Sequence, residues 1–350
     1  LDEGQSTRTY RAMDNKNNCH VALKELLDRF DDPVKRRDAI LQFQVEAKIL
    51  IALEHPAIPR FEEYFSYNNR RYFVIDFVEG DALDKIIQTS PLYDELQLLE
   101  WSIQLVNIID YMHSQKPEPV IFRDMCPKNV ILSSEGKLKI IDFGISKLFS
   151  PEAKTASVAK TVNPSYSPVE QYVGQTDQKS DIYSLGATIY FLVTRTIPVD
   201  AIDRSINDTP LTPCHRFNAN ISSEFEQIIL KAMGLNKVDR YDNIKEMKIA
   251  LEEVYKKVRK ARSLSSTGER SSLKTPETAK LKPMYIKKKD TIVTEDSTKK
   301  IQKIVERPGL FKRFWLIFVI ILFLICAGIL IFIKPGGIIN FLLKLLHLNK

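Results

Sequence analysis

The chain has 350 residues, of which 44% are hydrophobic and 27% charged, so it can form one or two domains with a large core. Its four cysteines are scattered without C-x-x-C spacing, which suits a reducing compartment and argues against a disulfide framework or a zinc site. The net charge of +7 is divided by region: residues 256–313 carry 18 Lys and Arg against 6 Asp and Glu, whereas residues 1–255 carry 30 against 38. This acidic balance excludes nucleic acid from the partners we expect for residues 1–255.

The first part of the chain predicts strands around one long helix. Residues 32–53 place apolar side chains close to a 3.6-residue period and stop before His55 and Pro56, which predicts a helix. Residues 61–67 and 72–78 predict a hairpin through residues 68–70, and helices are expected at residues 83–88 and 95–113. Because the chain begins without methionine in what looks like a first strand, we expect residues to precede it, and no secretory signal is present at this end.

Residues 120–144 place chemistry-bearing side chains at the ends of two short apolar strands. Asp124 and Asn129 lie five residues apart in a predicted loop, and Asp142 follows the second strand. Residues 130–132 and 138–141 predict a hairpin, which would bring these three side chains together. Phosphoryl transfer from ATP needs such a set: a carboxylate to accept the hydroxyl proton, and a carboxylate with an amide oxygen to hold Mg²⁺.

At this point the sequence resembles the protein kinase family, with FRD-x4-N in place of H-R-D-x4-N and a complete D-F-G. Further motifs follow the family in order: VALK at residues 21–24, SPVE at residues 167–170 and DIYSLG at residues 181–186. Arg240 resembles the arginine that pairs with the glutamate of the A-P-E segment, here Glu170. The resemblance covers residues 1–255, and the EQY and DIYSLGAT sequences are similar to those of bacterial membrane kinases.

The resemblance implies a role for each polar residue of the catalytic centre. Asp124 would accept the proton of the substrate hydroxyl, and Lys24 would contact the ATP phosphates. Glu46 would form an ion pair with Lys24, and Asn129 and Asp142 would be the ligands of Mg²⁺.

The same resemblance implies a nucleotide site in the first part of the chain. Gly4 is the only glycine left of the family's G-x-G-x-x-G loop over the phosphates. Ile75 would be the gatekeeper residue, and the backbone from Asp76 to Val78 would hydrogen-bond adenine.

Several positions depart from the family pattern. Asp2 and Thr7 stand where the outer glycines of the phosphate loop belong, so this loop should be stiffer. Cys126 replaces the lysine that follows the catalytic aspartate by two residues in serine/threonine kinases, and Lys128 is expected to neutralise the phosphate instead. Asn163 replaces a threonine that normally contacts this aspartate and lysine.

The segment from the D-F-G to the A-P-E region, residues 142–170, contains many serines and threonines. Phosphorylation can order such a segment through pairing with arginine, and Arg123 is the family's usual partner. We therefore expect phosphorylation in this segment.

The remaining chain predicts a helical lobe, a linker and a membrane anchor. Helices are expected at residues 181–194, 222–233 and 243–258. Residues 259–313 lose hydrophobic periodicity and predict a basic, disordered juxtamembrane linker.

Residues 314–333 form an uncharged apolar run of 20 residues, about 30 Å as a helix, which predicts one transmembrane helix. Six basic residues lie in the 15 positions before this run and three in the 17 after it, so the kinase part is expected on the cytoplasmic side. Residues 334–350 would form a short extracytoplasmic tail, and the basic linker would be drawn to the anionic membrane surface.

Together these patterns predict an α+β chain with a two-lobed protein kinase fold at residues 1–258 and one C-terminal transmembrane helix. The resemblance implies a single-pass kinase of the cell membrane that phosphorylates serine and threonine hydroxyls of protein substrates, itself included, with ATP and Mg²⁺. A membrane-tethered pseudokinase that acts as a binding or scaffold module is the alternative. A homodimer stays open, because the sequence does not determine the oligomeric state.

Overall fold

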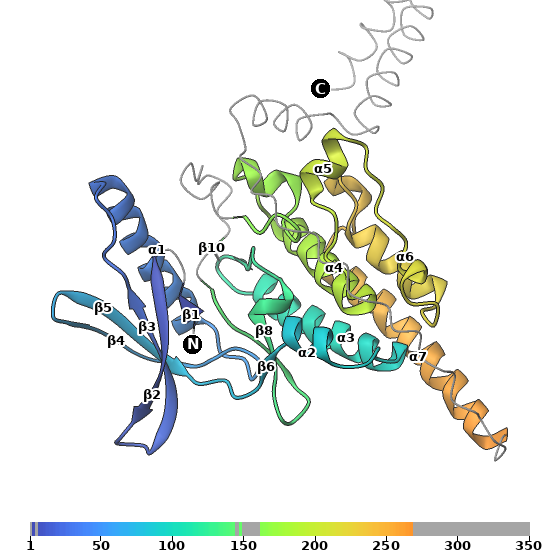
Figure 1. Cartoon of the computed structure of the whole chain (residues 1–350), viewed down its shortest axis with the longest axis horizontal. Helices are drawn as coiled ribbons and strands as arrows, with labels where there is room; N and C mark the ends of the chain where they lie inside the picture. The colour runs from blue at the N-terminus through green and yellow to red at the C-terminus, as the bar shows by residue number, and fades with distance from the viewer. Residues whose placement is uncertain (1, 4–5, 144–146, 149–161, 269–350) are drawn as a thin grey trace, which may run out of the picture. The chain divides into compact units, whose positions relative to one another are not determined.

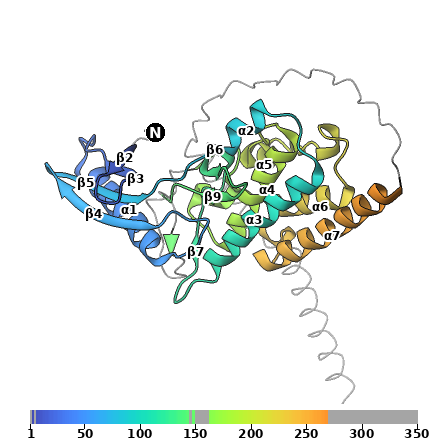
Figure 2. The ribbon, with the colours of Figure 1, turned by 90° about the horizontal axis from the view of Figure 1, so that it is seen from below.

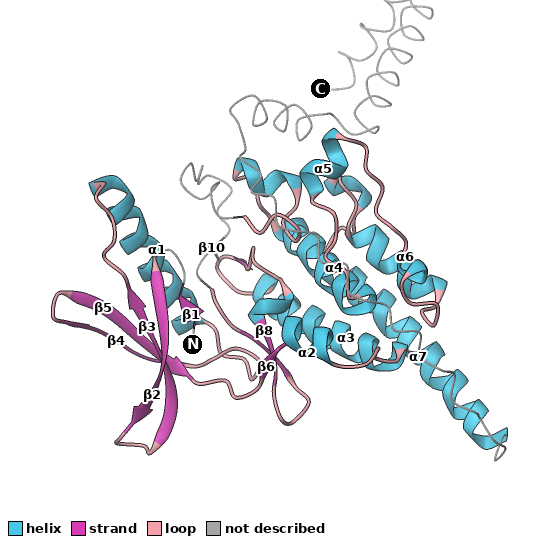
Figure 3. Ribbon diagram, viewed as in Figure 1, coloured by secondary structure: helices cyan, strands magenta, loops and turns pink. Residues whose placement is uncertain are grey.

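The computed structural model describes residues 2–3, 6–143, 147–148 and 162–268. Two lobes lie along the chain, the first rich in strands and the second in helices (Figure 3). The first lobe holds a five-stranded antiparallel sheet with the strand order β1-β2-β3-β5-β4. Its strands are β1 (Asp2–Glu3), β2 (Thr7–Asp14), β3 (Cys19–Leu26), β4 (Phe61–Tyr67) and β5 (Arg70–Asp76).

The hairpin between β4 and β5 has a tighter turn than the sequence predicted. Asn68 and Asn69 both have positive φ, 48° and 58°, and Tyr67 pairs with Arg70. This two-residue turn suits the twist of the flanking strands, and asparagine tolerates positive φ better than most residues. β5 therefore begins at Arg70 and ends at Asp76, two residues earlier at each end than predicted.

Helix α1 (Pro33–Ala52) packs beside this sheet (Figure 1). The side chain of Asp32 accepts a hydrogen bond from the backbone N–H of Val34, and Pro33 at the first helical position needs no partner for an N–H. The helix buries Phe43, Ala47, Ile49 and Leu50 together with the carboxylate of Glu46. A buried glutamate in an apolar face requires a nearby cation.

The second lobe is built from helices whose long axes lie side by side in two views (Figures 1 and 2). Helices α3 and α7 pack together, as do α4 and α6, around a continuous apolar core. The helices are α2 (Leu83–Thr89), α3 (Glu95–His113), α4 (Gln178–Thr194), α5 (Ala201–Ile206), α6 (Ser223–Ala232) and α7 (Ile244–Gly268).

The predicted hairpin at residues 130–141 is formed by two short strands that follow the first lobe in the chain. β8 (Val130–Leu132) pairs with β9 (Leu138–Ile140), and β6 (Asp81–Ala82) pairs with β8 on the other side. β7 (Val120–Ile121) pairs with β10 (Lys147–Leu148). The predicted hairpin is confirmed, and it places the loop before β8 next to the residues that follow β9.

The C-terminal predictions have different outcomes. α7 extends to Gly268, ten residues beyond the predicted helix end, so residues 259–268, expected in the disordered linker, are helical. Among residues 2–3, 6–143, 147–148 and 162–268, no helix is long and apolar enough to cross a membrane. The predicted span at 314–333, the tail at 334–350 and the linker beyond Gly268 lie outside the described residues.

Candidate active site

A lysine between two carboxylates joins the two lobes. Lys24 Nζ on β3 lies 2.7 Å from Glu46 Oε1 on α1 and 2.9 Å from Asp142 Oδ1 after β9. The side chains of Lys24 and Glu46 are 8% and 3% exposed, whereas that of Asp142 is 44% exposed. Burial alone would lower the pKa of Lys24, but Asp142 and Glu46 outweigh it and raise the pKa, so the ammonium stays charged. The predicted ion pair is confirmed, and Asp142 shares it.

The predicted loop residues also converge. Asn129 is buried, and its Nδ2 donates to the backbone oxygen of Asp124 at 3.0 Å and to Asp124 Oδ2 at 2.9 Å. The N–H of Ile141 donates to the Asn129 oxygen at 2.9 Å, which ties this loop to the strand that leads into Asp142. Burial and then the negative charge of Asp142 raise the pKa of Asp124 to about 6. An aspartate with a pKa raised in this way is suited to exchange a proton near neutral pH.

Asp181 holds this loop in place, a role that the sequence prediction missed. It lies in the first turn of α4 with no exposed surface, and its Oδ2 and Oδ1 accept from the N–H groups of Phe122 (2.9 Å) and Arg123 (2.7 Å). His113 Nε2 lies 2.8 Å from Asp181 Oδ2. A carboxylate in an otherwise apolar helix needs partners, and this signal in the sequence could have identified it.

Two further side chains donate hydrogen bonds to backbone oxygens of the loop that contains Asp124. Thr188 Oγ1 on α4 donates to the Met125 oxygen at 2.9 Å, and Gln171 Nε2 donates to the Arg123 oxygen at 3.0 Å. Arg123 itself has a φ of 72° and is 1% exposed, and burial lowers the pKa of its guanidinium to about 10. The residues expected to pair with Arg123 after phosphorylation lie almost entirely outside the described residues.

The departures from the family pattern occupy different environments. Cys126 is buried, and its burial, followed by the charge of Asp124, raises the pKa of its thiol, which keeps it protonated. Lys128 is exposed on the short turn Pro127–Asn129, and its charge lowers the pKa of Asp124. Asn163 accepts at its backbone oxygen from the N–H groups of Tyr166 and Ser167. The structure thus leaves Lys128 as the accessible cation of this turn.

Glu170 and Arg240 form a buried ion pair in the second lobe. Arg240 Nη1 lies 2.7 Å from Glu170 Oε1, Arg240 Nη2 donates to Glu170 Oε2 at 3.1 Å, and Ser180 Oγ donates to Glu170 Oε1 at 2.9 Å. The arginine and glutamate side chains are 0% and 3% exposed. The predicted pairing is confirmed.

The predicted adenine-binding backbone lies where β5 leaves the first lobe. Ile75 and Asp76 end β5, and Val78 is half-buried in the connection to the second lobe. The N–H of Asp76 donates to the Arg60 oxygen at 2.9 Å, so this group is already engaged. Gly4, the predicted phosphate-loop glycine, lies outside the described residues, between β1 and β2.

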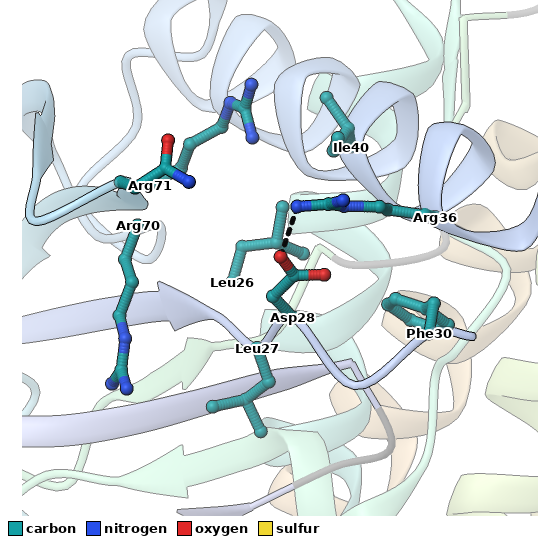
Figure 4. A pocket seen from close by; sticks show the side chains of 9 residues that line it. Leu26, Leu27, Asp28, Phe30, Arg36, Ile40, Arg70 and Arg71 are labelled. Atoms are coloured by element: carbon teal, nitrogen blue, oxygen red, sulfur yellow. Dashed lines mark hydrogen bonds and ion pairs between the residues drawn. The ribbon is translucent and has the colours of Figure 1, made fainter. Parts of the chain in front are cut away.

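A small pocket in the first lobe is separate from this centre (Figure 4). Leu26, Ile40 and Phe30 contribute apolar surface, and Arg36 forms an ion pair with Asp28 at its edge. None of the catalytic residues predicted from the sequence lines it. We therefore assign it no part in catalysis.

Residues 1–255 match the family model described as the protein kinase domain. The chain belongs to the protein kinase family.

Several curated bacterial kinases are similar to this chain. A probable serine/threonine-protein kinase of Clostridium perfringens is 28% identical over 73% of this chain and 37% of its own length. The serine/threonine-protein kinase B of Synechocystis is 31% identical over 66% of this chain and 41% of its own length. PrkC of Bacillus subtilis is 29% identical over 72% of this chain and 39% of its own length. The matched part therefore spans about two fifths of these relatives.

A solved structure described as the apo form of PpkA-294 has a TM-score of 0.61 with this chain and 23% sequence identity. The match covers 72% of this chain and 93% of that one. It supports the two-lobed kinase fold.

Proposed function

We propose that this chain is a serine/threonine protein kinase that transfers the terminal phosphoryl group of ATP to hydroxyls of proteins, its own included. The observation that carries this proposal is the single ammonium of Lys24 within 2.9 Å of both Glu46 and Asp142. Such a contact holds the phosphate-binding cation beside the metal-binding carboxylate, as phosphoryl transfer requires. The bacterial relatives are all named serine/threonine-protein kinases, which supports serine and threonine as the substrate hydroxyls.

Each polar residue of the candidate site has a separate proposed role in phosphoryl transfer. Lys24, oriented by Glu46, would hold the ATP phosphates. Asp124 would orient the substrate hydroxyl and accept its proton, because Asn129 fixes its carboxylate through Oδ2. Lys128, exposed on the same turn, would approach the developing charge of the transferred group.

The oxygen atoms of Asn129 and Asp142 are suitable ligands for Mg²⁺, and phosphate oxygens of ATP would supply the remaining ligands. In the part of the chain that the structure describes, no cluster of three or more His, Cys, Asp or Glu side chains could hold a metal ion. Asn129 and Asp142 instead offer an amide oxygen and a carboxylate, the hard oxygen ligands that Mg²⁺ prefers, and ATP phosphates would complete the set. When bound, Mg²⁺ would neutralise phosphate charge in the transition state.

Incubation of the full chain in detergent with radiolabelled ATP and Mg²⁺ tests the activity. We expect labelling of the chain and of added casein on serine and threonine, and no labelling by Asp124→Asn. An unlabelled wild-type chain that still binds ATP would favour the pseudokinase alternative instead.

We further propose that residues 314–333 anchor the chain in the cell membrane, with the kinase lobes in the cytoplasm. The uncharged length and the six basic residues before it support this orientation. An impermeant thiol reagent applied to intact cells should label a cysteine introduced near Lys350 and spare one introduced at Ser271. The opposite labelling pattern would reverse the topology.

A further inference from the structure

Helix α7 changes character along its length. Its first half buries Ile244, Met247, Leu251 and Val254 at the spacing of one helical face, and this half packs against α3. From residue 259 to residue 264 every side chain is exposed, although the helix continues to Gly268 (Figure 1). Residues 259–264 therefore form a helical segment without a buried face.

This exposed end carries a concentrated positive charge. Residues 256–262 contain five basic side chains and no acidic one. Arg262 forms an ion pair at 3.0 Å with Asp94, the residue that caps α3, and so holds the helix end to the lobe. The α7 basic face consists of the other four exposed cations, Lys256, Lys257, Arg259 and Lys260.

Exposed apolar side chains accompany the charge. Leu264 is 66% exposed and follows Lys256 and Lys260 at intervals of four residues, which places it on the same side of the helix. Leu92, two residues before the Asp94 that binds this helix end, is 50% exposed. Lysines whose aliphatic stems flank exposed leucines are typical of helices that lie in the interface of an anionic bilayer.

Four acidic groups lie near this face. Glu252 and Glu253 lie on the preceding turn of α7, four residues before Lys256 and Lys257, and the charge of Lys257 reaches Glu224 on α6. Glu100 on α3 accepts a hydrogen bond from Tyr255, which contacts Arg259. Residues 256–262 themselves carry five basic side chains and no acidic one, and this concentrated positive charge attracts negatively charged headgroups.

We propose that the α7 basic face and Leu264 bind the surface of an anionic membrane. The four cations would contact lipid phosphates while Leu264 enters the headgroup region, and a nucleic acid would leave the leucines without a partner. In the sequence, 45 residues separate Gly268 from the apolar run at 314–333, and an extended chain of that length reaches about 150 Å. The linker is thus long enough for the helix to reach the membrane that we propose for this run.

The test uses residues 1–268, because this part contains every described helix and strand and the whole apolar core. It lacks residues 314–333, so the result does not depend on membrane anchoring or on kinase activity. We expect the fragment to float with vesicles of phosphatidylcholine and phosphatidylglycerol, but not with phosphatidylcholine alone. Added salt should release it, since screening weakens surface attraction.

Lys256→Glu with Lys260→Glu should reduce the partition coefficient at least about thirtyfold, because each lysine near such a surface contributes about 1 kcal/mol. Leu264→Ala should reduce it about fivefold through lost apolar burial. Lys16→Glu with Lys245→Glu is the matched control, since it makes the same charge change at exposed sites outside the face. Equal loss in the control, equal binding to neutral vesicles, or preference for a short DNA duplex over anionic vesicles would overturn the proposal.

Discussion

Lys24 Nζ and Glu46 Oε1 lie 2.7 Å apart in the buried interior of the first lobe, although 22 residues separate them in the chain. The contact connects the third strand of the sheet to α1. The same ammonium reaches Asp142 Oδ1 at 2.9 Å, across 118 residues of sequence. One cation therefore connects the helix of the first lobe to the carboxylate that we propose as a magnesium ligand.

The burial of this pair makes Lys24→Met costly for stability as well as for catalysis. We expect no phosphoryl transfer, and a free energy of unfolding lower by about 3–5 kcal/mol, because Glu46 is left buried without its cation. Burial raises the pKa of Glu46, so the carboxylate should take up a proton in this variant. Urea unfolding and radiolabelled phosphate transfer measure the two effects.

The double variant Lys24→Met with Glu46→Gln serves as the control. It removes both charges, so it should recover most of the lost stability and none of the activity. If the single and double variants unfold at the same urea concentration, the pair contributes little to the fold. Transfer within a few-fold of the wild-type rate in either variant would contradict the assignment of Lys24.

How far the sequence predicts this site depends on the distance between residues along the chain. The hairpin of β8 and β9 follows from local alternation and turn residues, so the approach of Asp124, Asn129 and Asp142 could be predicted. The pairing of Lys24 with Glu46 came only from the family resemblance, because nothing in a helical pattern shows which cation meets a glutamate. The burial of Lys24, on which the expected loss of stability in Lys24→Met depends, is likewise known only from the structure.

Two features could not be predicted from hydrophobic periodicity and turn residues: the contacts of Asp181 and the end of α7. The support of the catalytic loop by Asp181 joins residues almost 60 positions apart, and only the tertiary packing of α4 reveals it. The end of α7 was predicted ten residues too early because its apolar period stops near Val258, whereas the helix continues to Gly268 through residues 259–264, which are all exposed. Residues such as lysine, arginine, alanine and leucine favour helix, and this preference sustains the end of α7.

The raised pKa of Asp124 predicts an acidic limit to the activity. The carboxylate must be ionised to accept the hydroxyl proton, so kcat/KM should rise with pH and reach half its maximum at about 6. Between 3.8, the ordinary value of an aspartic acid, and about 6, the folded state binds this proton more tightly than the unfolded chain. The contribution of Asp124 to stability therefore falls as pH rises through that interval. A profile without a transition between pH 5 and 7 would argue against a proton-accepting Asp124 in this environment.

Lys128 and Cys126 should differ sharply in their effect on phosphoryl transfer. Lys128→Ala removes an exposed cation that lowers the pKa of Asp124, so kcat should fall by about 10² and the acidic limb should move to higher pH. Cys126→Ala removes a buried, neutral thiol whose hydrogen bond also lowers the pKa of Asp124, so the acidic limb should move slightly to higher pH while kcat stays within a few-fold of the wild type. Steady-state kinetics over a range of pH values distinguishes the two. Equal effects of the two changes would show that Lys128 does not approach the transferred phosphoryl group.

The buried ion pair of Glu170 and Arg240 should stabilise the second lobe. Arg240→Ala leaves the carboxylate of Glu170 without its bidentate partner at a site where both side chains are almost fully covered. The free energy of unfolding should fall by about 3–5 kcal/mol. Arg240 also donates to the carbonyls of Gly234, Leu235 and Lys179, and these acceptors would be left unsatisfied as well.

Calorimetry of residues 1–268 measures this loss, and Lys179→Ala provides a comparison. Lys179 forms an ion pair with Asp242, whose side chain is 78% exposed, and donates to the backbone oxygen of Lys237, so Lys179→Ala should cost much less stability than Arg240→Ala. Glu170→Gln with Arg240→Met should be more stable than Arg240→Ala alone, because no buried charge is left unpaired. A loss from Arg240→Ala no larger than that from Lys179→Ala would mean that the pair does not hold the second lobe together.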